Sequence, residues 1–130
     1  MILSMRETFV PAMRNSNATH VDFGFLRGII RDNPNFMPSN IDMVLERKGN
    51  FLFGEWKRED EEIKTGQKIL LKELAWIHRV LLITGYVDNT PHVSLIQQIL
   101  PNGNLKVVGK SPADLIKYIQ DWYKDAENND

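Results

Sequence analysis

The stretch that decides the fold is PSNIDMVLERKGNFLFGEWK, residues 38–57. It contains two apolar runs, IDMVLER and FLFGEWK, which are separated by Lys48, Gly49 and Asn50. A Gly-Asn pair between two such runs is typical of a tight β-hairpin, because glycine readily adopts the positive φ that the turn requires. We therefore expect an antiparallel hairpin with Gly49 and Asn50 at its turn.

This hairpin would bring charged side chains together. With that turn, Asp42 pairs with Lys57, and Glu55 lies on the same face as Lys57 because side chains alternate along a strand. A register shifted by one residue would place Asp42 opposite Glu55 and would keep the group together. The other positions are apolar on both faces, which is typical of strands in a sheet that is covered on both sides.

Two carboxylates in apolar surroundings are costly. At a separation of about 4 Å they repel each other by about 4 kcal/mol for an effective dielectric constant of about 20, and Lys57 can neutralise only one of them. A divalent cation would relieve this repulsion, and carboxylate oxygens suit Mg²⁺ or Mn²⁺. The pattern therefore indicates a cation site at Asp42 and Glu55.

The combination of Asp42, the E-W-K triplet at residues 55–57 and Gln67 near the start of a helix resembles the PD-(D/E)XK nuclease superfamily. Within it, the sequence is most similar to the Holliday-junction-resolvase and virus-type replication-repair nuclease branches. The resemblance covers about residues 38–75 and rests on the combination, since an isolated E-x-K is common. One departure is that Pro38 stands four residues before Asp42 instead of next to it.

The resemblance implies a metal-dependent nuclease that hydrolyses phosphodiester bonds of DNA, with structured or branched DNA as a candidate substrate. Its catalytic residues would be Asp42, Glu55, Lys57 and Gln67. Asp42, Glu55 and the backbone carbonyl of Trp56 would hold Mg²⁺, for which Mn²⁺ would substitute; the metal would activate a water and offset charge on the phosphate. Lys57 would orient the water or neutralise the transition state, and Gln67 would help to position water or phosphate.

Two other interpretations stay open. The chain could be a catalytically inactive nuclease-fold protein that acts as a binding or interaction module, with the charges kept as a buried network. It could also be an unrelated α+β binding module in which Glu55 and Lys57 form an incidental surface pair. That reading predicts exposed Asp42 and Glu55 side chains and no effect of Mn²⁺ on stability. The net charge of −1 also counts against a dedicated nucleic-acid binder, which is usually basic.

The other segments predict the rest of the fold. Apolar residues at helical spacing predict a helix over residues 20–32 and another over residues 65–78, with Thr65 as its N-cap. Residues 79–87, 92–100 and 105–108 are typical of strands, and the last two should form a hairpin. Ser111, Pro112 and Asp114 are typical of a helix start. The apolar stripe of that helix would contain Leu115, Ile116, Ile119, Trp122 and Tyr123.

These elements define the expected fold class, α/β (α+β). We expect a restriction-endonuclease-like core, a central mixed sheet with helices on both faces, in the order α-β-β-α-β followed by a C-terminal hairpin and helix. The chain has 130 residues, 42% hydrophobic and 25% charged, which is ordinary for a globular protein with a real core. We therefore expect one nuclease-like domain, residues 1–125, and a disordered tail, residues 126–130.

Further residues are candidates for substrate contacts. Arg27 and Arg31 lie one turn apart in the expected first helix and could hold a DNA backbone, although two arginines on a solvated face are the plainer reading. Many superfamily members carry an additional acid on an N-terminal helix, and Glu7 is the candidate here. A solvated surface glutamate is the alternative for Glu7.

Lys64, Lys68 and Lys72 recur every four residues and would form a basic edge beside the proposed site. Lys64 and Lys68 are the candidates for contacts with DNA phosphates. The polar run at residues 58–62, REDEE, would repel DNA, so in a nuclease we expect it to point away from the substrate groove or to be mobile.

The composition also indicates the kind of site and the cellular environment to expect. There are no cysteines, which excludes thiolate metal sites and cysteine nucleophiles. The longest apolar run, residues 80–87, is too short to span a bilayer, and residues 1–13 lack the apolar core of a signal peptide. We expect an intracellular, cytoplasmic protein with DNA as its partner, no membrane partner, and a homodimer if the stripe of the last helix is exposed.

Overall fold

The computed structural model describes residues 22–128 of the chain. The chain divides into two units, Met1–Pro38 and Ser39–Asp130.

The described part of the first unit contains one short 3₁₀ helix, η2 (Phe23–Leu26). The Asp22 carboxylate accepts a hydrogen bond from the Gly24 N–H at 2.8 Å at its start. The prediction of a helix over residues 20–32 is wrong, because Gly28 adopts a φ of 83° and so interrupts helical geometry. The apolar side chains of Phe25 and Ile29, which helical spacing would have aligned on one face, are exposed.

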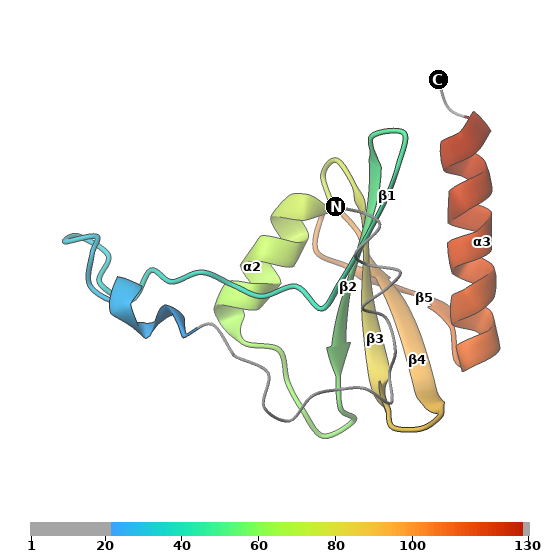
Figure 1. Ribbon diagram of the computed structural model, residues 1–130, viewed down its shortest axis with the longest axis horizontal. Coiled ribbons are helices and arrows are strands. Elements are labelled where there is room, and N and C mark those ends of the chain that lie inside the picture. Colours follow the sequence, from blue (N-terminus) through green and yellow to red (C-terminus); the bar gives the residue numbers. More distant parts are fainter. Residues whose placement is uncertain (1–21, 129–130) are drawn as a thin grey trace. The chain divides into compact units, whose positions relative to one another are not determined.

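The second unit is an α+β fold built on a five-stranded mixed sheet with two helices (Figure 1). Its elements in chain order are β1 (Met43–Arg47), β2 (Asn50–Lys57), α2 (Thr65–Leu74), β3 (Arg79–Val87), β4 (Pro91–Ile99), β5 (Leu105–Gly109) and α3 (Pro112–Asn128). The strands lie side by side in the same order. Strands β2 and β3 are parallel and are joined through α2, whereas the other neighbouring pairs are antiparallel.

This arrangement confirms the predicted β-β-α-β order with a C-terminal hairpin and helix. The sequence did not decide whether this hairpin belongs to the main sheet. In the structure β4 and β5 pair with each other and extend the main sheet. Parallel strands require a crossover connection, and the segment between β2 and β3 supplies it with α2.

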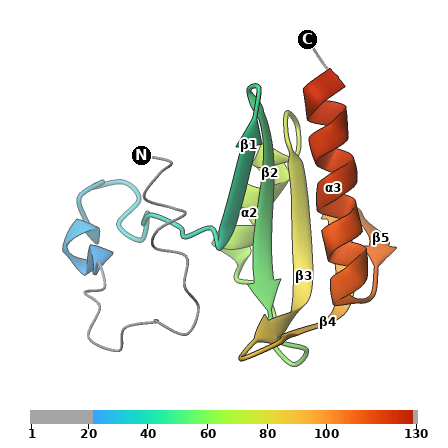
Figure 2. The same cartoon turned by 45° about the vertical axis from the view of Figure 1, so that its right-hand side comes forward.

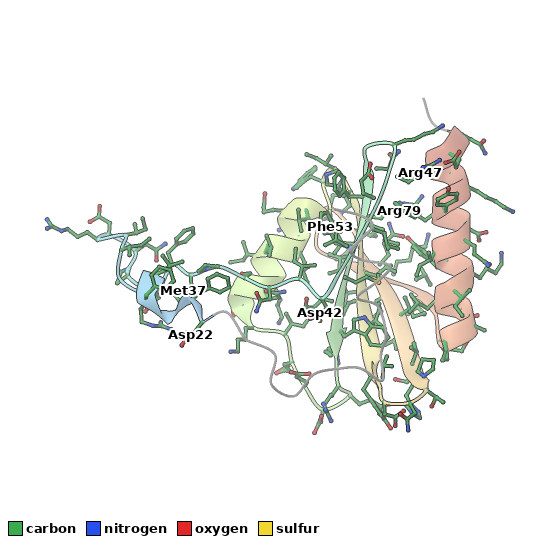
Figure 3. The ribbon with its side chains drawn as sticks, in the orientation of Figure 1. Asp22, Met37, Asp42, Arg47, Phe53 and Arg79 are labelled. Carbon is green, nitrogen blue, oxygen red and sulfur yellow. The ribbon has the colours of Figure 1, made fainter. Side chains whose placement is uncertain are left out.

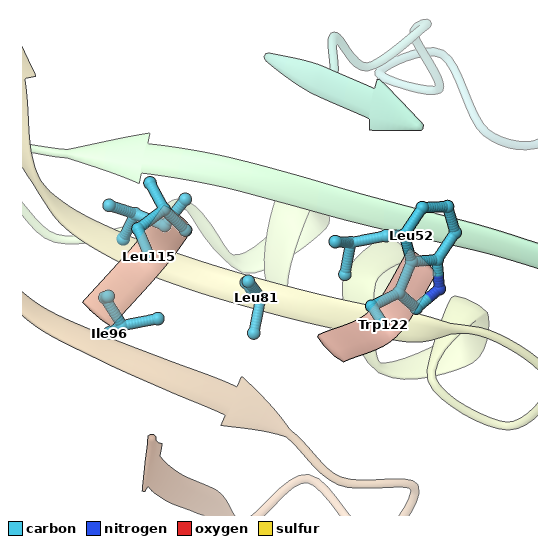
Figure 4. Packing of buried hydrophobic residues seen from close by; sticks show 6 residues of the cluster. Leu52, Leu81, Ile96, Leu115 and Trp122 are labelled. Atoms are coloured by element: carbon cyan, nitrogen blue, oxygen red, sulfur yellow. The ribbon is translucent and has the colours of Figure 1, made fainter. Parts of the chain in front are cut away.

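The two helices cover opposite faces of the sheet (Figures 1 and 2). On one face, Leu115 and Trp122 of α3 pack with residues of β2, β3 and β4 that include Leu52, Leu81 and Ile96 (Figure 4). On the other face, α2 packs with alternate strand residues; that cluster consists of Leu71, Ala75, Val80, Leu82 and Ile99. Apolar burial on both sides of β3 explains its continuous apolar sequence.

Helix α2 differs in its bounds from the prediction. It ends at Leu74, four residues earlier than expected, and the turn that follows leads directly into β3. Its N-cap residue is Lys64, which makes no side-chain capping bond, so the prediction of Thr65 as N-cap is wrong.

Helix α3 starts as predicted, with the Ser111 hydroxyl accepting a hydrogen bond from the Asp114 N–H at 3.1 Å. It continues to Asn128, three residues into the segment that we expected to be disordered. Ala126 is only 2% exposed, and Glu127 forms an ion pair with Arg47 of β1. These contacts order residues 126–128; residues 129 and 130 lie outside the described part of the chain.

Within residues 22–128, no helix is both long enough and apolar enough to cross a bilayer.

Candidate functional site

The β1–β2 hairpin has a register one residue away from the predicted one. Its turn residues are Lys48 and Gly49, with φ values of 52° and 80°, and Arg47 pairs with Asn50. A two-residue turn with positive φ at both positions matches the twist of the strands. Because glycine suits either position, the sequence did not decide whether the turn residues are Lys48 and Gly49 or Gly49 and Asn50. The predicted pairing of Asp42 with Lys57 is therefore wrong.

The last paired residues of this hairpin are Met43 and Gly54. Asp42 and Glu55 stand one step beyond them, so the two acids are opposite neighbours, as the alternative register predicted. Asp42 itself is exposed, but its Oδ2 accepts a hydrogen bond of 2.8 Å from the backbone N–H of Trp56. This bond holds the Asp42 carboxylate against β2. Asp42 thus lies at one end of the hairpin, and Arg47 lies at the other end, beside the turn (Figure 3).

Glu55 is half-buried on the face that α2 covers. Among the residues that the structure describes, its buried Oε1 has no hydrogen-bond partner. Burial, and then the nearby charge of Asp42, raise the pKa of Glu55 above its ordinary value of 4.5. Hydrogen bonding from the Gln67 amide and from the Asp42 backbone lowers this pKa without cancelling the shift. A positive charge beside Oε1 would therefore stabilise the ionised form.

Gln67 lies in the first turn of α2 and is half-buried. Its Nε2 donates a hydrogen bond of 2.7 Å to the backbone oxygen of Asn40. The amide thus ties the start of α2 to the segment that leads into β1, close enough to Glu55 to lower its pKa.

Lys57 lies at the end of β2, and its Nζ donates to the backbone oxygen of Arg58 at 3.2 Å. Its side chain lines a cavity of about 470 Å³ together with Lys68 and Lys72 of α2. Glu61 and Glu62 line the same cavity, so this part of the acidic run does not point away from the three lysines. The Arg58 N–H donates to Glu61 Oε1 at 2.8 Å, and this bond folds the run back.

Three of the remaining candidates, Lys64, Arg27 and Arg31, lie within the described residues. Lys64 is the exposed N-cap residue of α2 and, unlike Lys68 and Lys72, does not line the cavity at Lys57. Arg27 and Arg31 belong to the first unit, where both are exposed. Glu7 lies outside the described residues.

The structure adds Thr84, which sequence reasoning missed. Thr84 of β3 pairs with Lys57 across the parallel strands and is only 5% exposed. Its Oγ1 is buried and has no hydrogen-bond partner within residues 22–128. The only signal in the sequence was a hydroxyl in the otherwise apolar run RVLLITGYV, and nothing local relates that position to Lys57.

The oxygen atoms at Asp42, Glu55 and Trp56 suit a cation that keeps part of its water shell. No group of three or more His, Asp or Glu side chains in the described part of the chain could hold a metal ion. Asp42 and Glu55 offer two carboxylates, one with a buried unpaired oxygen, and the backbone carbonyl of Trp56 follows Glu55 directly in the chain. Mg²⁺ commonly binds proteins through one or two carboxylates and keeps waters or substrate phosphates for its other positions.

Comparison of the chain with protein-family models, with curated proteins and with solved structures found no match.

Proposed function

We propose that the second unit is a Mg²⁺-dependent deoxyribonuclease with a restriction-endonuclease-like core. The observation that carries the proposal is the buried, unpaired Oε1 of Glu55 beside the Asp42 carboxylate. Two adjacent acids, one of them partly desolvated, destabilise the fold unless a proton or a cation compensates them. The order of elements supports the same reading, because Lys57 ends β2 and Gln67 lies in the first turn of the following helix.

Asp42, Glu55 and the carbonyl of Trp56 would hold the cation. When bound, it would supply Lewis-acid chemistry, activating a water and offsetting negative charge on the phosphate. The hydrogen bond from the Trp56 N–H keeps the Asp42 carboxylate in place for this role. Gln67 keeps the start of α2 next to Glu55 through its bond to Asn40.

The side chains around Lys57 would bind the DNA backbone. Lys57, Lys68 and Lys72 share one cavity and offer three ammonium groups to phosphates. Glu61 and Glu62 offset part of this charge, which favours weak non-specific binding.

A catalytically inactive binding module of the same fold is the second candidate. The acids beside Lys57 favour it, together with the net charge of −1. The exposure of Asp42 is instead what the third reading predicts. The buried oxygen of Glu55 argues against the third reading, an incidental surface pair.

Cleavage of supercoiled plasmid and of branched DNA, with Mg²⁺ or Mn²⁺, tests the proposal. The wild type should nick, and Lys57→Ala should not. Lys117→Ala is the matched control, because Lys117 is an exposed lysine of α3 paired with Asp121. It should nick like the wild type. Equal nicking by the wild type and Lys57→Ala would contradict the assignment.

A further inference from the structure

Two aromatic rings stack on each other at the β3–β4 turn, near the end of β2. Tyr86 and His92 are paired residues of the two strands, and their ring centroids lie 4.4 Å apart with an interplanar angle of 19°. Both stay accessible, since Tyr86 is 47% exposed and the His92 side chain 44%. Exposed aromatic faces of this kind are the usual platforms for unpaired nucleobases.

The stacked pair is held in place by its turn. His92 Nε2 lies 3.2 Å from Asp88 Oδ1 and 3.3 Å from the Thr90 hydroxyl. The Asp88 carboxylate also accepts a hydrogen bond from the Thr90 N–H at 2.9 Å. Gly85, at an irregularity of the β3–β4 pairing, permits the close approach, because a Cβ there would overlap the His92 carbonyl oxygen. A ligand would therefore meet a platform that is already formed.

A cavity of about 480 Å³ lies against this pair, and its lining includes Arg58, Glu59 and Asp60. The volume is within the range of small-ligand sites. Two carboxylates disfavour a phosphate in this cavity, but they can accept hydrogen bonds from the exocyclic amino group of a base. The chemistry of the lining thus favours a base over a phosphate.

Arg58 connects this cavity with the proposed catalytic end. The lining of a neighbouring cavity of about 310 Å³ includes Lys57, Arg58 and Tyr86, together with one carboxylate, that of Glu61. The two cations there outnumber the single acid, so this cavity suits a phosphate better than the first one does. A phosphodiester at Lys57 and Arg58 would accordingly have an adjacent base within reach of the platform. Lys57 and Tyr86 lie near the carboxyl-terminal ends of β2 and β3, which are at the same edge because those strands are parallel. His92 lies near the start of the antiparallel strand β4 and so reaches the same edge.

We propose that Tyr86 and His92 form a stacking site for an unpaired DNA base next to the phosphodiester that Lys57 contacts. The inference rests on the proposed function and deepens it by naming the substrate class. A base can reach the platform only when it is unpaired, so the preferred substrate is DNA with a single-stranded segment at the cut, such as an overhang, flap or branch.

The test is binding in EDTA, where no cleavage occurs, of a duplex whose single-stranded overhang carries one 2-aminopurine. The wild type should quench the 2-aminopurine fluorescence and should bind this probe more tightly than the blunt duplex. Tyr86→Leu should weaken overhang binding by about 10-fold and remove the quenching. Tyr86→Phe should keep both, because the ring and not the hydroxyl stacks, and His92→Leu should reduce both.

Tyr123→Leu is the matched control, because Tyr123 of α3 is 45% exposed and lies outside both cavities. It should bind like the wild type. An absence of quenching by the wild type, or an equal loss of overhang and blunt-duplex binding in Tyr86→Leu, would overturn the inference. Quenching that depends on Tyr86, without any nicking, would refute the proposed nuclease activity and keep the stacking site. Nicking by the wild type, with quenching unchanged in Tyr86→Leu, would refute the stacking site and keep the nuclease activity.

Discussion

The backbone N–H of Trp56 donates a hydrogen bond of 2.8 Å to Oδ2 of Asp42. Asp42 precedes β1 and Trp56 lies near the end of β2, so this bond continues the contact of the two strands beyond their last paired residues. Because Trp56 follows Glu55 directly, the bond also brings the two carboxylates together. The proposed metal site depends on this proximity.

Glu55→Gln should raise the melting temperature of the metal-free protein at pH 7. The pKa of Glu55 is raised above 4.5 by burial and by Asp42, so the folded state binds this proton more tightly than the unfolded state does. The free energy of unfolding therefore falls as the pH rises from about 4.5 through the higher folded-state pKa. Glutamine does not titrate, so the advantage of the variant should be largest at neutral pH and should vanish below about pH 4. Thermal unfolding in EDTA across this range measures it, and a pH-independent difference would contradict the prediction.

Millimolar Mn²⁺ should raise the melting temperature of the wild type but not that of Asp42→Asn. A cation at ten times its Kd stabilises the folded state by about 1.4 kcal/mol, which is a shift of several degrees for a small domain. Asparagine can still accept the Trp56 hydrogen bond, so the fold should survive the loss of charge. Asp121→Asn, on the exposed side of α3, is the control and should keep the full shift. A wild-type response in Asp42→Asn would exclude Asp42 as a ligand.

Gly85→Ala should lower the free energy of unfolding by more than about 2 kcal/mol, because the added Cβ overlaps the His92 carbonyl oxygen. Gly66→Ala is the matched control. A Cβ at Gly66 meets nothing within 4 Å in the first turn of α2, so this change should stabilise by about 0.5 kcal/mol. Urea denaturation of both variants compares the two effects. A neutral Gly85→Ala would show that the β3–β4 pairing is looser than the structure indicates.

Ala126→Asp should destabilise the protein by about 2–3 kcal/mol, because it places a charge at a position that is 2% exposed. Lys124→Asp introduces the same side chain at an exposed position of α3 and should cost less than about 0.5 kcal/mol. Chemical denaturation measures the difference. Equal effects would indicate that the end of α3 frays in solution, as composition alone had suggested.

The elements that the sequence predicted well are those whose pattern is local. The strands of residues 43–57 and 79–109, α2 and the start of α3 follow from apolar periodicity, turn residues and a capping serine. The prediction of a helix over residues 20–32 failed because apolar spacing alone does not outweigh two glycines in a segment where Phe25, Ile29 and Ile30 stay exposed. The end of α3 was missed because Ala126 and Glu127 are ordered by contacts, not by helical propensity.

The sequence by itself determined that Glu55 and Lys57 share one face of a strand and that Asp42 lies close to them, because side chains alternate and the turn is short. Only the tertiary structure decided which residue is opposite Asp42, that Thr84 pairs with Lys57, and that Tyr86, His92 and Arg58 surround one cavity. Those relationships depend on the parallel pairing of β2 with β3 and on the irregular pairing at Gly85. Both are contacts between residues far apart in the chain, and packing of the whole sheet sets them.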